Sequence, residues 1–72
     1  MGISYKKLWK LLIDKDLKKK DLPTLANIST SSVTKLSKNM NVSTEILEKI
    51  CRALSCDTSD IMEMIEDTPN NL

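Results

Sequence analysis

The sequence predicts an all-α fold in which five short helices pack into one compact bundle. Two observations support this fold class: apolar residues recur at helical spacing along most of the chain, and no segment shows the alternation typical of a strand. The chain has 72 residues, 40% of them hydrophobic, with one Trp, one Tyr and no Phe, so its core must be aliphatic. A chain of this length forms one domain, which we place at residues 1–66, and we expect 67–72 to fray.

The charges are unevenly distributed, although the formal net charge is only +1. Residues 1–38 hold nine lysines against three aspartates, a net charge of +6. Residues 39–72 hold two basic residues against seven acidic ones, a net charge of −5. An asymmetry of this kind favours nucleic acid or another charged surface as the partner.

The composition excludes several classes of protein. The absence of His rules out His-based catalysis and imidazole metal sites, and two Cys cannot form a four-thiolate zinc site. One Gly, at position 2, leaves no glycine-rich phosphate loop. No apolar run is long enough to span a bilayer, and no signal peptide is visible. We therefore expect a cytoplasmic protein that is not an enzyme and that uses no cofactor, no metal and no small-molecule substrate.

Cys51 and Cys56 are five residues apart. In an intracellular protein the simpler interpretation is that both are reduced, with Cys51 a small apolar residue on a helix and Cys56 at its end. A disulfide or a redox sensor is the alternative.

The first predicted helix covers residues 4–16. Leu8, Leu11 and Leu12 follow the i, i+3, i+4 spacing of an apolar helix face, and lysines occupy most of the remaining positions. Ser4 is a suitable N-cap. We expect the following lysine-rich stretch to be a connection, with Leu17 turned toward the core.

The second predicted helix, at about 19–26, is short and its start depends on Pro23. Proline is tolerated in the first turn of a helix, where its missing N–H has no partner. The helix therefore begins either after Asp21 as N-cap or near Lys19. Asn27 follows it, and Asn readily adopts the left-handed conformation that ends a helix.

The third predicted helix, at about 30–38, is capped by Ser29 or Thr30. Val33 and Leu36 form its narrow apolar edge, and its other side chains are hydroxyls and lysines. Because hydroxyl residues favour caps and turns over helix interiors, neighbouring elements must hold this helix in place. Its polar face is then free for another role.

Two further helices are predicted in the acidic half. Ser43 or Thr44 caps a fourth helix at 44–54, whose apolar residues form one continuous face: Ile46, Leu47, Ile50, Cys51 and Leu54. Asp57 and Asp60 have the spacing of a capping box, which predicts a fifth helix through Ile65.

Residues 22–36 combine two short helices, a tight turn at Asn27 and apolar anchors at Leu22, Ile28, Val33 and Leu36. This is the pattern of a helix-turn-helix. From Leu8 to about Ile65 the chain resembles the Cro and repressor-type (XRE-like) helix-turn-helix family. The resemblance rests on the motifs L-x-x-x-x-x-I-S, S-x-V-x-x-L and I-x-x-A-L-x-C-D-x-x-D-I.

The resemblance implies roles by position. In the family, the exposed start and middle of the second motif helix read bases, while phosphates are contacted by the start of the first helix and the loop after the second. The base-reading residues here are then Thr30, Ser31, Thr34 and Lys35. The phosphate-contacting residues are then Lys18, Lys19, Lys20, Lys38, Asn39, Asn41 and Ser43. Lys35 is the strongest base-reading candidate, since lysine donates to guanine O6 and N7. A lysine run such as Lys18–Lys20 is equally typical of a solvated loop.

The chain departs from the family at several points. Pro23 stands where the family prefers Ala, and Asn27 replaces the usual turn Gly. The glutamines common at base-reading positions are absent, so no operator preference can be transferred. The family often buries an Arg–Glu pair between two helices, and the matching positions here are Leu12 and Ser37. Apolar packing often replaces such a pair without loss of stability.

These observations predict a small transcriptional regulator, expected to be a repressor, that binds double-stranded DNA as a homodimer. A single short helix makes few base contacts, which favours two copies on one site. The fifth predicted helix is the expected dimer interface, and its methionines suit either that surface or the core. The interface residues are Ile61, Met62, Met64 and Ile65. The alternative is a protein-binding module, such as an antitoxin, anti-repressor or adaptor.

Overall fold

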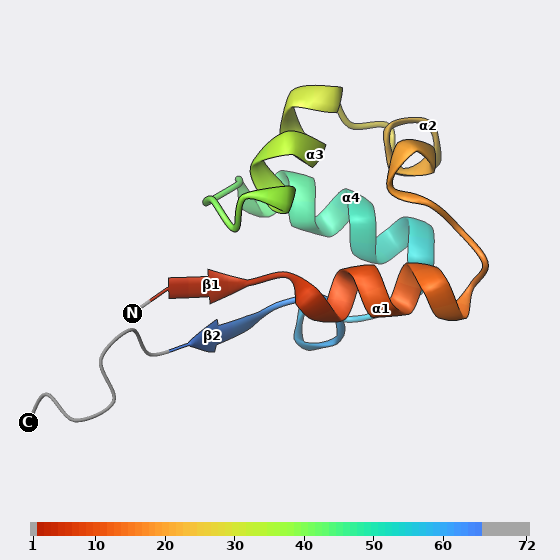
Figure 1. The fold of residues 1–72 in the computed structure, drawn as a ribbon. Helices are drawn as coiled ribbons and strands as arrows, with labels where there is room; N and C mark the ends of the chain where they lie inside the picture. The colour runs from red at the N-terminus through yellow and green to blue at the C-terminus, as the bar shows by residue number, and fades with distance from the viewer. Residues whose placement is uncertain (1, 66–72) are drawn as a thin grey trace, which may run out of the picture.

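The computed structural model describes residues 2–65, so the predicted tail at 67–72 lies outside the described residues. Within 2–65 the chain forms four α-helices, two 3-10 turns and a two-stranded antiparallel sheet (Figure 1). In chain order these elements are β1 (Gly2–Ser4), α1 (Lys6–Asp14), η1 (Lys19–Asp21), α2 (Leu22–Ala26), α3 (Thr30–Ser37), α4 (Thr44–Leu54), η2 (Thr58–Asp60) and β2 (Glu63–Ile65). No helix in this part of the chain has the length and apolar character needed to cross a bilayer.

The prediction of an all-α fold without strands is wrong at the two ends of the described chain. β1 and β2 pair antiparallel, with Ile3 opposite Met64 and Ser4 opposite Glu63. Each strand has only three residues, too few to show an apolar–polar alternation in the sequence. The sheet joins the two ends of the domain (Figure 1).

The predicted fifth helix is replaced by η2 and β2. The capping box forms as expected, since the N–H of Asp57 donates to Asp60 Oδ2 at 3.0 Å. It begins only one 3-10 turn, because the chain then becomes extended and its backbone pairs with β1. A local start signal was therefore overridden by a partner strand far away in sequence.

The start of the second helix is divided between two elements. α2 begins at Leu22 and has Pro23 in its first turn, where the missing N–H costs nothing. A 3-10 turn from Lys19 precedes it, and the Asp21 carboxylate accepts the N–H of Lys18 at 2.9 Å. The sequence predicts a start near Lys19 or directly after Asp21. The 3-10 turn begins at the first of these points, and α2 begins at the second.

The predicted caps of α3 and α4 are confirmed. Ser29 Oγ accepts the N–H of Ser32 at 3.2 Å, and Ser43 Oγ accepts the N–H of Ile46 at 3.3 Å. At the start of α1, by contrast, Ser4 belongs to β1 and Tyr5 occupies the N-cap position without a side-chain cap. Ser4 Oγ still accepts the N–H of Lys6 at 3.3 Å.

All four α-helices end at residues with left-handed backbone conformation, and none of these residues is glycine. The positive φ angles are 61° at Asp16, 58° at Asn27, 57° at Asn39 and 55° at Ser55. In each case the next residue's N–H donates to the carbonyl five residues back, which is the Schellman arrangement. The left-handed conformation predicted for Asn27 is confirmed. Ser55 lacks the amide or carboxylate that makes this conformation less costly for Asn and Asp.

Replacing Ser55 with glycine should therefore stabilise the domain by about 1 kcal/mol, because glycine adopts positive φ without steric cost. Urea denaturation should show a higher midpoint with an unchanged m value. Ser37→Gly is the matched control, since Ser37 is helical and exposed, and this change should lower the midpoint. A lower midpoint for Ser55→Gly would contradict the strain assigned to Ser55.

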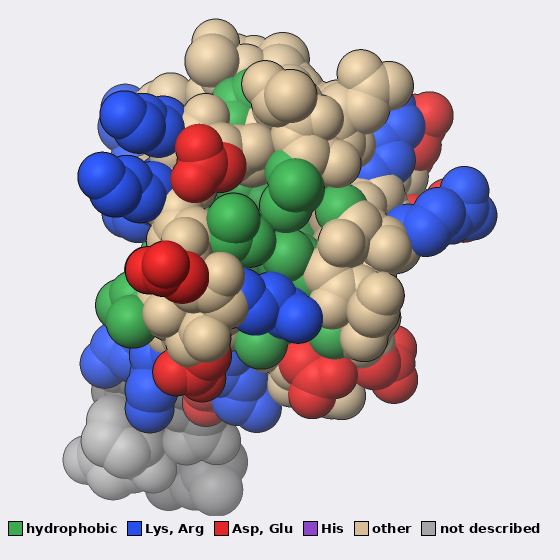
Figure 2. Space-filling model, turned by 90° about the vertical axis from the view of Figure 1, so that its right-hand side faces the viewer, with side chains coloured by type: hydrophobic (Ala, Val, Ile, Leu, Met, Phe, Trp, Pro, Cys, Tyr) green, Lys and Arg blue, Asp and Glu red, His purple; other side chains and the backbone are tan. Residues whose placement is uncertain are grey.

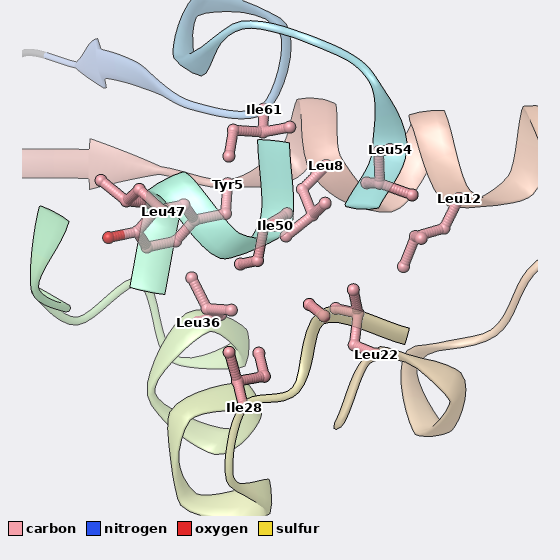
Figure 3. Close-up of a cluster of buried hydrophobic side chains, with 11 residues drawn as sticks. Tyr5, Leu8, Leu12, Leu22, Ile28, Leu36, Leu47, Ile50, Leu54 and Ile61 are labelled. Atoms are coloured by element: carbon pink, nitrogen blue, oxygen red, sulfur yellow. The ribbon is translucent and has the colours of Figure 1, made fainter. Parts of the chain in front are cut away.

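The core lies between α1 and the layer formed by α2 and α3, with α4 at its centre (Figures 1 and 3). Buried side chains come from every α-helix, from the residue before α1, from the turn before α3 and from the residue after η2. These are Tyr5, Leu8, Leu12, Leu22, Ala26, Ile28, Leu36, Leu47, Ile50, Leu54 and Ile61. The core is aliphatic apart from one aromatic ring, as the composition predicts. Leu17 and Val33 pack against its edge.

Candidate nucleic-acid interface

The helix α3 lies on the outside of the bundle and is held by one apolar edge. Leu36 is 0% exposed and points toward Ile50, while Val33 packs against the same core (Figure 3). The turn before α3 is fixed by the left-handed Asn27 and the buried Ile28. These contacts orient α3 so that the side opposite Leu36 faces solvent.

All four predicted base-reading residues are exposed on that solvent-facing side. They occupy two i, i+4 pairs, which places them together on one helix face. The residues are Thr30, Ser31, Thr34 and Lys35. Their contacts with DNA remain a prediction, whereas their shared exposure follows from the fold.

The hydroxyl groups on this face have local hydrogen bonds that limit what they can offer. Thr34 Oγ1 donates to the Thr30 carbonyl at 3.1 Å, so toward a ligand it presents lone pairs and a methyl group. Ser31 Oγ lies 2.9 Å from Ser29 Oγ. Thr34 is therefore suited to a base amino group or a thymine methyl, and Lys35 to guanine acceptors.

The lysines before α2 are all exposed, but they are not equivalent. Lys19 Nζ lies 4.2 Å from the centroid of the Trp9 ring, a cation–π contact that holds this side chain against α1. The backbone N–H of Lys18 is bonded to Asp21. Lys19 and Lys20 thus belong to a 3-10 turn at the start of the motif, with Lys18 as its N-cap, and their contact with phosphate stays a prediction.

The loop between α3 and α4 brings the other predicted phosphate contacts to the surface. Each of them is exposed: Lys38, Asn39, Asn41 and Ser43. Ser43 Oγ accepts the N–H of Ile46, which leaves its O–H free to donate to a phosphate. Asn39 has a structural task as well, because its Oδ1 accepts the N–H of Tyr5 at 3.2 Å. The amide nitrogen of Asn39 remains available to donate to a phosphate.

Tyr5 is the important residue that sequence reasoning missed. Its side chain is 1% exposed, and its O–H donates to the Met40 carbonyl at 2.9 Å. Burial raises the pKa of the Tyr5 phenol, so the hydroxyl stays protonated and remains a donor. Together with the Asn39 bond, this contact ties the α3–α4 loop to the start of α1. A buried Tyr usually has a hydrogen-bond partner for its O–H group. The lone Tyr of the sequence could therefore have been predicted to bind a polar group if it was buried.

The four residues predicted to form a dimer interface are not equally accessible. Ile61 is fully buried in the core, so it cannot contact a second copy in this fold. Met62 is half-buried, while Met64 and Ile65 in β2 are 60% and 41% exposed. Of the four predicted interface residues, Met64 and Ile65 of β2 are therefore the exposed ones.

Comparison with known proteins identifies the family. The model of the Cro/C1-type helix-turn-helix DNA-binding domain matches residues 7–67. The chain belongs to this family. The solved structure of the transcriptional regulator VanUg is 48% identical, covers 92% of this chain and 88% of its own, and superposes with a TM-score of 0.87. No curated protein matched the chain.

In this Cro/C1-type domain the positions of the expected Arg–Glu pair hold other residues. Leu12 is buried in the core and Ser37 is exposed. No charged or polar residue is buried among the described residues, so the core that joins α1 to the rest of the motif contains no buried ion pair. Because no buried charge needs compensation, this replacement carries no desolvation cost.

Replacing Tyr5 with phenylalanine should destabilise the Cro/C1-type domain by about 1 kcal/mol, since one hydrogen bond to a backbone carbonyl is lost while the ring still fills the core. Thermal unfolding followed by circular dichroism measures this loss. Met40→Leu is the control, because it keeps the carbonyl that Tyr5 binds. If Tyr5→Phe and the parent unfold at the same temperature, the contact to Met40 does not stabilise the loop.

Proposed function

We propose that this chain is a transcriptional regulator that binds double-stranded DNA with the exposed face of α3 in the major groove. The observation that carries the proposal is the polar, solvent-facing side of α3, which four small or basic residues share. The major groove admits an α-helix and displays a distinct donor and acceptor pattern for each base pair. Thr30, Ser31, Thr34 and Lys35 then read bases, and VanUg, described as a transcriptional regulator, supports the assignment.

Phosphates on both sides of the groove are contacted by two exposed clusters. Lys18, Lys19 and Lys20 precede α2, while the α3–α4 loop supplies the second cluster. That second cluster is Lys38, Asn39, Asn41 and Ser43. Contacts of this kind position the helix without reading sequence. A regulator of this type acts in the cytoplasm, where the DNA is.

We further propose that two copies bind one operator. One α3 helix of eight residues offers few base contacts, so a second copy is needed for specificity. Met64 and Ile65 of β2, with Met62 beside them, are the proposed contact surface. Light scattering at high micromolar concentration with operator DNA should give the mass of two chains per duplex. A mass of one chain per duplex contradicts the dimer and leaves DNA binding untouched.

A protein-binding module is the second candidate, and one observation favours it. Apolar side chains gather on the face where α1, α2 and α4 end, bordered by basic and acidic side chains (Figure 2). Leu25 of α2 is 44% exposed, and it lines a shallow hollow with Ala53 of α4. An exposed apolar patch with a charged border is typical of a protein contact.

A gel shift with random-sequence duplex separates the two candidates. Binding through phosphates releases counterions, so affinity should fall roughly hundredfold between about 50 mM and about 200 mM salt. Retention at low salt with this loss at higher salt supports DNA binding. No retention at about 50 mM salt supports the protein-binding module instead.

Replacing Lys19 with alanine should weaken binding to all duplexes alike and reduce the salt slope by about 1, because one phosphate contact is lost. Fluorescence anisotropy over a salt series measures the slope. Lys7→Ala is the matched control: the Lys7 amino group donates to the Ser59 carbonyl on η2, away from α3, and its removal should leave the slope unchanged. Equal slopes for Lys19→Ala and the parent would remove Lys19 from the interface.

A further inference from the structure

The end of α4 places two cysteines next to each other. Ser55 has left-handed backbone conformation, and the N–H of Cys56 donates to the Cys51 carbonyl at 2.9 Å. This is the Schellman arrangement, in which the side chains at these two positions commonly make contact. Here both side chains are thiols, and the proximity of Cys56 contributes to the raised pKa of the Cys51 thiol.

Both thiols can be reached from solvent. Each is free and half-buried, and both line one open hollow of about 620 Å³ on the outer side of α4. The exposed surface of the hollow is largely apolar, and its lining also includes Leu47 and the Glu48–Arg52 ion pair of α4. A ligand that binds both sulfurs therefore has room for an apolar substituent beside them.

The surroundings of the two sulfurs restrict the chemistry of such a ligand. Among the described residues no group of three or more potential metal ligands forms, so a four-coordinate zinc site has too few donors. Burial raises the pKa of Cys51 to about 11 and also raises that of Cys56. Asp57 and Asp60 oppose thiolate formation further. Both thiols are therefore protonated near pH 7, which slows oxidation and favours a neutral ligand that reacts with S–H groups.

We propose that Cys51 and Cys56 form a dithiol site for a monosubstituted trivalent arsenical, whose organic group lies in the adjoining hollow. Such a compound carries two As–OH groups, each of which can react with one thiol. Cys51 and Cys56 supply two thiols at the end of α4. At each thiol an As–S bond forms and an As–O bond breaks, and the S–H proton leaves with the hydroxide as water. Arsenic stays trivalent and neither sulfur is oxidised, so no oxidant is required.

The test treats the full reduced chain with phenylarsine oxide and measures its intact mass. One phenylarsenic group per chain is expected, with one molecule of water released per phenylarsine oxide consumed and with both thiols protected from N-ethylmaleimide. Ethanedithiol should remove the group and expose both thiols again. Binding of two groups per chain, or alkylation of a thiol in the loaded protein, overturns the proposal.

Two single variants, Cys51→Ser and Cys56→Ser, test whether both sulfurs are needed. Each should bind the arsenical at least about tenfold more weakly, because only one As–S bond remains. Circular dichroism confirms that each variant is folded before it is titrated. A variant that is folded and binds as tightly as the parent contradicts a two-thiol site. If either variant fails to fold, the number of phenylarsenic groups bound per parent chain decides whether both thiols bind one arsenic.

Discussion

Replacing Leu36 with alanine should destabilise the domain by about 2–5 kcal/mol, the usual cost of truncating a fully buried leucine. Leu36 is 0% exposed and is the fully buried residue of α3. A chain of 72 residues has little stability to spare, so a loss of this size leaves a large unfolded fraction at room temperature. DNA binding should fall with the folded fraction, because α3 has poor intrinsic helix propensity and depends on this anchor.

Urea denaturation followed by circular dichroism, with Trp9 fluorescence as a second probe, measures the effect of Leu36→Ala. Leu25→Ala is the matched control, since Leu25 is 44% exposed and its truncation leaves no closed cavity. We expect the control to cost under about 1 kcal/mol. Equal losses for the two variants would mean that α3 is not anchored through Leu36.

Replacing Lys35 with alanine should weaken binding to the preferred duplex by about 1–3 kcal/mol and relax discrimination at one base pair. Lys35 is an exposed residue of α3, so its loss should leave the fold intact. The expected loss is specific because a lysine that donates to both guanine O6 and N7 finds fewer acceptors when another base stands at that position.

Fluorescence anisotropy with the preferred duplex and a series of single-base-pair variants measures the effect of Lys35→Ala. Lys38→Ala is the matched control, since Lys38 lies in the adjoining loop as a predicted phosphate contact. The control should weaken every duplex by a similar factor. If Lys35→Ala also weakens all duplexes equally, Lys35 contacts phosphate and the base-reading role is refuted.

Most of the helical core could be predicted from the sequence because its signals are local. Leu8 and Leu12, one turn apart, identify the buried face of α1, and both prove buried. Ser29 and Ser43 directly precede apolar helical patterns, and both form the expected caps. The left-handed turn at Asn27 follows from the residue type alone.

The two ends of the described chain could not be predicted in the same way. β1 and β2 have three residues each, and they become strands only because they pair with each other. The capping box at Asp57 is a local signal for a helix start, and it cannot show how far the helix continues. Ile61 was consequently assigned to a surface, whereas the structure buries it.

The candidate interface was predictable in part. Exposure of Thr30 and Lys35 follows from the narrow apolar edge of α3, which turns Leu36 into the core and leaves the polar residues outside. The bonds from Tyr5 to Asn39 and Met40 were not predictable, because they join residues 34 and 35 positions apart. Long-range hydrogen bonds of this kind depend on the assembled fold and leave no periodic pattern in the sequence.

Selection of duplexes from a random library by the full chain, followed by sequencing, tests the proposed role of α3 most directly. We expect an enriched site with two related half-sites about one helical turn apart, each read by one α3. The enrichment should weaken at one position per half-site when Lys35→Ala is used in place of the parent. A library that stays random after repeated selection at low salt would contradict sequence-specific DNA binding by α3.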